Sequence, residues 1–244
     1  MTRTATRSMR SPSRGGGRAR KYVMVLVIIV ALLVAADFAA RVAAQNVMAT
    51  KIQEQGLSHK PDVSIGGFPF LTQVASKDLK QVTISTTNLT EGPVTISRIN
   101  ATATGTRLNS YTSQSGTISS LSGTALISFA SLGNTLTQQV GPLGSLLKGA
   151  GLNLVAAGPH EVRASVNLLV TSGSATWRVS QVSGNQLHIS LVSSSGLPSS
   201  LLGSIQNLTV QIPKLPLGLT INSISVTQSG VVGRLSAHNV PFGS

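Results

Sequence analysis

The sequence predicts an α+β protein with mainly antiparallel strands, preceded by a membrane-spanning segment. Three observations support this fold class. Residues 22–36 are apolar and uncharged, residues 37–55 contain neither glycine nor proline, and apolar residues alternate with polar ones after Gly56. The first pattern is typical of a segment that enters a membrane, the second of a helix, and the third of strands with one buried face.

The N-terminus is a basic segment followed by an apolar one. Seven Arg and Lys residues precede Tyr22 without an acidic residue among them. This order directs a chain into or across a membrane, and the basic end stays on the cytoplasmic side. We therefore expect a disordered basic cytoplasmic tail over residues 1–21, a transmembrane signal-anchor over 22–36 and an extracytoplasmic domain over 37–244.

Retention or cleavage of the apolar segment depends on its length and on the residues after it. Its length of fifteen residues is at the boundary between the apolar region of a signal peptide (about 7–15 residues) and a spanning helix (about 20). Small residues suited to cleavage occur at 34–36 and at 42–44. Helical character nevertheless continues to Gln55, and one face of that helix collects Phe38, Val42, Ala49 and Ile52. Packing of this face against the domain favours an uncleaved anchor over a cleaved signal.

Alternation of apolar and polar residues indicates the strands. The clearest strand runs from Val162 to Val170, with Arg163, Ser165 and Asn167 on its polar face. Further alternating segments cover 82–86, 94–101, 175–179, 187–191, 208–212, 217–221 and 224–226. A change of phase between Ile96 and Ile99 predicts a β-bulge. Helices are expected at 132–140 and 143–148, and turns at 172–173 and 183–185.

An antiparallel sheet with one apolar face must cover that face. A second sheet would do so in a sandwich, and so would the helix at 37–55 if a curved sheet wrapped around it. The inward residues are mostly Val, Leu, Ile and Ala. They form either an ordinary core or the wall of an aliphatic channel for acyl chains, because concave apolar pockets are the usual form of ligand site.

Charge and aromatic content argue against a nucleic-acid-binding protein. The net charge is +13, and the seven basic residues before Tyr22 supply more than half of it. The rest of the chain has twelve basic and six acidic residues, a net charge of +6. Aromatic residues make up 3% of the chain, too few for the stacking platforms that single-strand binders use. A mild excess of basic residues outside a membrane fits anionic lipid headgroups.

The sequence contains no recognisable catalytic or metal-binding motif. His160–Glu161 does not continue as HExxH, no two glycines have the spacing of GxSxG, and Ala150 stands where a P-loop requires lysine. The absence of cysteine excludes disulfides and thiolate chemistry. We expect no catalytic residue, metal or cofactor. A hydrolase whose site the sequence does not reveal is the least favoured alternative.

Two motifs resemble a known family. Residues 62–73 read DVSIGGFPFLTQ, and residues 212–230 read IPKLPLGLTINSISVTQSG. Together with the helix at 37–56 they are similar to the LmeA-like phospholipid-binding family of actinobacterial cell envelopes. The resemblance covers about residues 37–242. It implies a long helix held against a strongly curved sheet, as in tubular lipid-binding domains.

The resemblance also implies non-enzymatic phospholipid binding in the periplasm, in support of envelope lipid or lipoglycan assembly, with envelope-assembly enzymes as possible partners. Candidate lipid contacts are apolar residues of the motifs and of the inward strand faces: Phe68, Phe70, Leu71, Val166, Leu168, Ile189, Leu217 and Leu219. The motif residues can equally close the end of the sheet as core. The alternative function is therefore a membrane-anchored envelope scaffold whose β core is filled by its own side chains.

Overall fold

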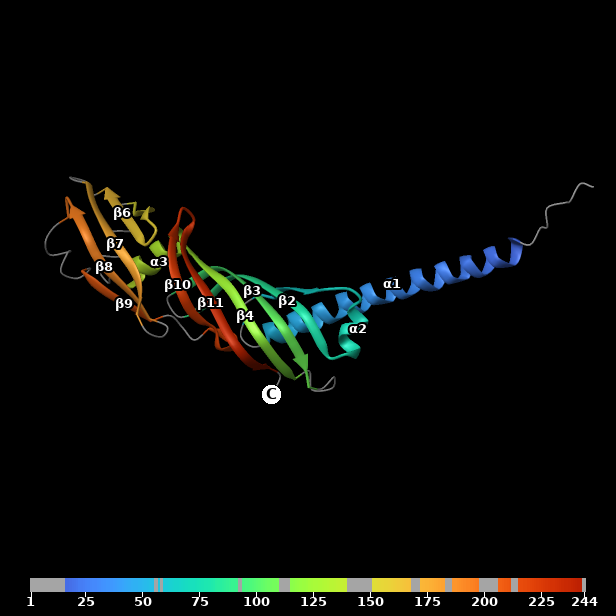
Figure 1. Ribbon diagram of the computed structural model, residues 1–244. Coiled ribbons are helices and arrows are strands. Elements are labelled where there is room, and N and C mark those ends of the chain that lie inside the picture. The colour runs from blue at the N-terminus through green and yellow to red at the C-terminus, as the bar shows by residue number, and fades with distance from the viewer. Residues whose placement is uncertain are drawn as a thin grey trace, which may run out of the picture.

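The computed structural model is an elongated molecule built from one long helix and two antiparallel sheets (Figure 1). It describes residues 16–54, 57, 59–91, 94–109, 115–139, 151–167, 172–182, 186–197, 206–211 and 215–242. The helix extends from one end of the molecule, a six-stranded sheet forms the middle, and a five-stranded sheet lies at the other end. The α+β class with antiparallel strands is thus confirmed.

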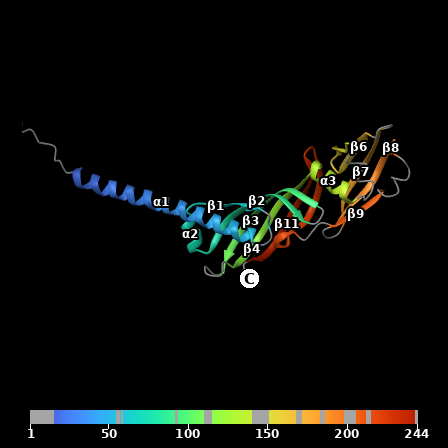
Figure 2. The same cartoon turned by 180° about the vertical axis from the view of Figure 1, so that it is seen from behind.

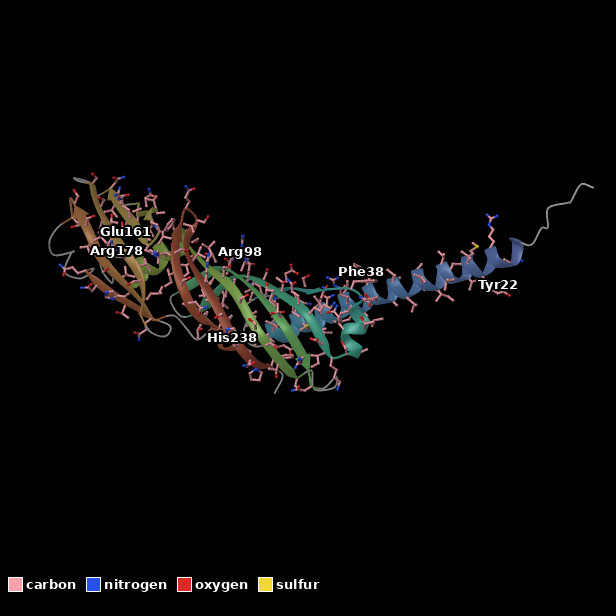
Figure 3. All side chains as sticks on the ribbon, in the orientation of Figure 1. Tyr22, Phe38, Arg98, Glu161, Arg178 and His238 are labelled. Carbon is pink, nitrogen blue, oxygen red and sulfur yellow. The ribbon has the colours of Figure 1, made fainter. Side chains whose placement is uncertain are left out.

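Helix α1 (Gly16–Gln53) is continuous through the apolar run and beyond it. Its residues 20–53 form a helix that is long and apolar enough to cross a membrane, and little of the most apolar part is buried. The helix leaves the rest of the molecule over this part, as the position of Tyr22 in Figure 3 illustrates. It also includes residues 16–21, which the sequence assigned to a disordered tail, because Arg and Lys are good helix formers. The tail residues 1–15 lie outside the described residues.

The C-terminal half of α1 packs on the six-stranded sheet. Ala49 is buried in the core, and the residues around it on the same face are partly buried: Ala40, Ala44, Met48 and Ile52. The predicted buried face of this helix is therefore wrong in part, since Phe38 is 65% exposed and Val42 is 39% exposed. The buried stripe instead starts at Asp37, one residue earlier, whose side chain is hydrogen-bonded to the domain.

The six-stranded sheet has the order β1-β2-β3-β4-β11-β10, and all of its pairs are antiparallel. Its strands are β1 (Asp62–Gly66), β2 (Asp78–Glu91), β3 (Val94–Leu108), β4 (Gly116–Ser128), β10 (Thr220–Thr227) and β11 (Gly230–Phe242). The short helix α2 (Phe70–Ala75) joins β1 to β2, and the 3₁₀ turn η1 (Pro216–Gly218) precedes β10. Figure 2 shows α1 lying along this sheet, with α2 beside it where the helix leaves the domain.

The second sheet has the order β5-β6-β7-β8-β9. Its strands are β5 (Asn153–Gly158), β6 (Glu161–Asn167), β7 (Ser172–Val182), β8 (Gln186–Ser195) and β9 (Asn207–Gln211). Helix α3 (Phe129–Gln139) matches the helix expected at 132–140 and contacts β3, β4 and β5. The turn expected at Ser172–Gly173 is wrong, because both residues pair with β6. The helix expected at 143–148 lies outside the described residues.

Four neighbouring strands change their buried face at one line across the six-stranded sheet. On one side of the line the buried residues are Leu79, Thr106, Ile118 and Val240, and on the other side Val82, Ala103, Leu121 and Ala237. Two of the residues on the line, Gly105 and Asn239, have φ of 63° and 51°. In β3 and β11 this left-handed residue rotates the strand, so the next side chains turn to the opposite face without any change of register.

The bulge that the sequence predicted between Ile96 and Ile99 is absent for the same reason. The register between β2 and β3 is constant from Arg98 to Ile96. Asn88, which lies opposite the residue between them, has φ of 53°. Its left-handed conformation accompanies the change of face, and Leu89, Ile96 and Ile99 are all buried. The apolar phase therefore slips through a rotation of both strands and not through an extra residue.

Replacing Thr106 with valine is expected to stabilise the protein by about 1 kcal/mol. Thr106 is 2% exposed, and its buried hydroxyl has no hydrogen-bond partner among the described residues. Valine keeps the shape of the side chain and removes the cost of burying that hydroxyl. Thermal unfolding should show a midpoint raised by about 2–4 °C. The same change at exposed Thr124 on β4 is the control, and an equal or lower midpoint for the Thr106 variant would contradict the expectation.

Candidate functional site

The two sheets meet along β10. This strand contacts β7 and β5, and the amide of Val226 donates a hydrogen bond of 2.6 Å to the carbonyl oxygen of Pro159, in the turn between β5 and β6. Among the described residues this is the one backbone hydrogen bond that joins the sheets. Most of the contact between them is therefore made by side chains.

A small cavity lies between the six-stranded sheet and Leu187 of β8, and its lining is entirely apolar. The lining residues come from β3, β4, β10 and β11 of one sheet, from β8 of the other and from the segment before η1: Ile96, Ala125, Ile127, Leu187, Leu215, Ile221, Ile224, Val231, Gly233 and Leu235. We call this lining the inter-sheet seam. With no polar side chain to satisfy, the seam suits a saturated hydrocarbon chain and offers nothing to orient a charged group.

The seam is nearly closed. Its cavity has a volume of about 30 Å³, which is far too small for an acyl chain. An acyl chain therefore fits only if the sheets separate or side chains rotate. Separation would break few polar contacts, because the sheets share so little backbone hydrogen bonding. Packing against the acyl chain would replace the packing between the sheets, and each methylene group that the chain buries contributes about 0.8 kcal/mol.

The apolar interior continues from the seam to the α1 end of the molecule. One core cluster includes Leu187 of β8, Leu235 of β11, Val82 of β2, Ala49 of α1 and Phe70 of α2. Both sheets and the helix thus share a single apolar interior, and the seam is a part of it that retains free space.

The candidate residues from the sequence fall in three places. Phe68, Phe70 and Leu71 lie at α2, where Phe70 is buried and the other two are 64% and 43% exposed. Leu217 and Leu219 lie just before β10, half-buried and buried. Val166 is buried in β6 and Ile189 is half-buried in β8, whereas Leu168 lies outside the described residues. The structure does not bring these groups together, and none of the seven described residues lines the seam.

Sequence reasoning missed the seam residues as a site, although it placed several of them on strands. Leu187 and Ile224 stood out by alternation, but alternation marks every inward residue alike. Which inward residues border the second sheet depends on the contacts of β10 with β5 and β7, whose residues lie far from β10 in the chain.

A buried carboxylate connects α1 to α2. Asp37 is 5% exposed. Its Oδ2 accepts a hydrogen bond of 2.9 Å from the amide of Phe70, and its Oδ1 accepts one of 2.7 Å from the amide of Leu71. These amides belong to the first turn of α2 and have no partner within that helix. The contact holds α2 against α1 at the point where the apolar run ends.

An open polar groove lies over β1, β2 and β3, with a volume of about 420 Å³. Its lining includes Lys60 and Arg98 together with Asp62. The hydroxyl of Ser85 donates a hydrogen bond of 2.8 Å to Oδ1 of Asn100, and both residues also line the groove. The groove can accept a solvated anionic group, but its polar walls do not suit an acyl chain. Within the described part of the chain, no three His, Cys, Asp or Glu side chains are placed to hold a metal.

Comparison with known proteins identifies one family. The family model described as LmeA-like phospholipid-binding matches residues 35–236, which include the helix from Asp37 onward, the seam and both sheets except the end of β11. Comparison with curated proteins and with solved structures found no match.

Proposed function

The chain belongs to the LmeA-like phospholipid-binding family, and on this premise we propose that it is a non-enzymatic phospholipid-binding protein whose inter-sheet seam holds acyl chains. The observation that supports this site most is the lining, which is apolar at all ten positions and comes from both sheets. Headgroup recognition would then fall to polar residues outside the seam. Leu217 and Leu219, which precede the seam residue Ile221 in the chain, stay candidates for contact with the lipid, as do the other residues inferred from the sequence.

We also infer that the six-stranded sheet curves around the C-terminal half of α1, as in tubular lipid-binding domains. The partly buried face of α1 from Ala40 to Ile52 supports this. The line at Gly105 and Asn239, where four strands change their buried face, supports it too, because a rotation shared by four strands bends a sheet. A curved sheet encloses an elongated apolar interior better than a flat one.

The proposed location is the cell envelope, with α1 as an uncleaved single-pass anchor, the basic N-terminus in the cytoplasm and the domain on the extracytoplasmic side. The basic residues before Tyr22 support this orientation. Asp37 argues against cleavage after Ala44, because that cleavage would remove its two hydrogen bonds to α2. In an actinobacterial envelope such a protein would support lipid or lipoglycan assembly, alongside the enzymes of that assembly.

A scaffold protein with a self-filled core is the second candidate function. The small volume of the seam, about 30 Å³, is the observation that favours it. A scaffold would keep the sheets closed and would take up no lipid. The two functions therefore differ in one measurable property, which is lipid uptake.

Native mass spectrometry of residues 37–244, purified without detergent and incubated with phospholipid vesicles, tests the proposal. This segment keeps Asp37 and the packed half of α1. We expect a folded domain that carries phospholipid at close to one molecule per chain. A folded domain that neither co-purifies with lipid nor takes it up from vesicles would support the scaffold instead.

A further inference from the structure

Exposed apolar side chains lie on α1 and on the α2 segment at the level of Asp37. Phe38 on the helix is 65% exposed, Phe68 in the loop before α2 is 64% exposed, and Leu71 in α2 is 43% exposed. We call these three residues the juxtamembrane patch. Figure 3 shows Phe38 at the point on α1 where α2 lies, beyond which the helix continues alone. The patch is therefore located at the boundary between the domain and the projecting part of α1.

Asp37 fixes this position. Its carboxylate bonds the amides of both Phe70 and Leu71, at 2.9 and 2.7 Å. Phe68 lies two residues before Phe70, in a loop that Gln73 also holds, through a hydrogen bond of 3.2 Å from its side-chain amide to the carbonyl oxygen of Gly66. Hydrogen bonds to the backbone on both sides of the loop thus hold Phe68 and Leu71 in their exposed positions.

The length of the apolar run leaves room for additional apolar surface at this level. The fifteen residues of 22–36 span about 22 Å as a helix, whereas the hydrocarbon core of a bilayer is about 30 Å thick. On the basic side, Arg and Lys side chains can reach outward to the interface. On the domain side, the residues directly after the run are Asp37, whose carboxylate is bonded, and Phe38.

The charged residues near the patch suit a lipid surface. Arg41 follows Asp37 by one helical turn, Lys77 follows the end of α2 and Lys80 lies near the start of β2, with Asp78 between the two lysines. Basic side chains behind an apolar patch are placed to meet lipid phosphates when the patch enters the interface.

From this juxtaposition we propose that Phe38, Phe68 and Leu71 insert into the interface of the bilayer that α1 spans, so that the domain is seated on the membrane surface. The partner is the bilayer itself and not a carried lipid molecule. The inference rests on the proposed membrane anchor but is independent of lipid uptake by the seam. Seating would leave the five-stranded sheet at the end of the molecule remote from the bilayer (Figure 1).

Site-directed spin labelling of the full chain tests the proposal, and the absence of cysteine makes each label unique. Phe68→Cys, Leu33→Cys and Val192→Cys are labelled separately and reconstituted in vesicles of phosphatidylcholine and phosphatidylglycerol in equal parts. Collision of the label with oxygen and with a water-soluble nickel complex gives its depth. Leu33 lies in the apolar run, and Val192 is 46% exposed on β8.

We expect the label at position 68 to be several-fold more protected from nickel than the label at 192, and to approach the value at 33. Protection should fall when Asp37→Ala is added, because the loop is then released from α1. Equal accessibility at 68 and 192, with position 33 protected, would overturn the patch and leave the anchor standing. Water-exposed labels at both 33 and 68 would overturn both. Spin–spin broadening that disappears on dilution with unlabelled protein would assign the patch to a second copy and overturn the proposal.

Discussion

Replacing Asp37 with alanine is expected to lower the free energy of unfolding by about 2–4 kcal/mol. The substitution removes the acceptor of two charge-assisted hydrogen bonds, each worth about 1.5–3 kcal/mol, from the amides of Phe70 and Leu71. Phe70 is 4% exposed, so water cannot replace the missing acceptor at its amide without a rearrangement. Leu71 is partly exposed and water can reach its amide, which keeps the total below the sum of the two.

Chemical unfolding of residues 37–244 followed by circular dichroism measures the change. Asp37→Asn keeps one carbonyl oxygen and should lose less than Asp37→Ala. Asp62→Ala is the matched control, because Asp62 is an exposed acidic residue at the start of β1 and should change stability by less than about 0.5 kcal/mol. Equal stabilities for the Asp37→Ala and Asp62→Ala variants would mean that the contact between α1 and α2 contributes nothing.

Replacing Ile224 with aspartate is expected to reduce phospholipid uptake at least tenfold. Ile224 is 7% exposed and faces the seam. A carboxylate there meets an apolar lining in which no polar side chain can solvate it, so an acyl chain beside it would lose about 1–3 kcal/mol or more of binding free energy. A loss of about 1.4 kcal/mol already corresponds to a factor of ten.

Ser223→Asp is the matched control for this prediction. Ser223 is the neighbouring residue of β10, is exposed, and pairs with exposed Arg234. The control adds the same charge to the same strand on its outer face, and uptake should stay within a factor of two to three. Circular dichroism establishes that both variants are folded. Unchanged uptake by a folded Ile224→Asp variant would exclude the seam as the acyl-chain site.

The sequence predicted the elements whose patterns are local. The apolar run and the uninterrupted helix after it need no distant partner, and α3 lies close to its expected position. Strands β6, β7 and β8 were found because their apolar residues alternate regularly. Strand β4 was missed because its phase changes between Ile118 and Leu121, where the strand crosses the line of face change. Strand β11 was missed for the same reason, at Asn239.

The site was beyond sequence reasoning because its contacts are distant in the chain. Asp37 was visible as an acidic residue directly after an apolar run, but its partners at α2 lie 33 and 34 residues away. Phe38 and Val42 were assigned to the buried face of α1, together with Ala49 and Ile52, because they are more apolar than Ala40 and Ala44. Two features decide which face of α1 turns toward the sheet. One is the pair of hydrogen bonds to the Asp37 carboxylate, and the other is the close approach that small side chains on that face allow.

Photolabelling by a phospholipid with a diazirine in its acyl chain tests the location of the bound chain most directly. Residues 37–244 are loaded with this lipid, freed of vesicles and irradiated, and the labelled residues are mapped by mass spectrometry. We expect labels concentrated on the seam residues Leu187, Ile221, Ile224 and Val231. Labels confined to Phe68, Leu71 and the exposed residues of α1, or no label in a folded domain, would contradict the assignment of the acyl chain to the seam.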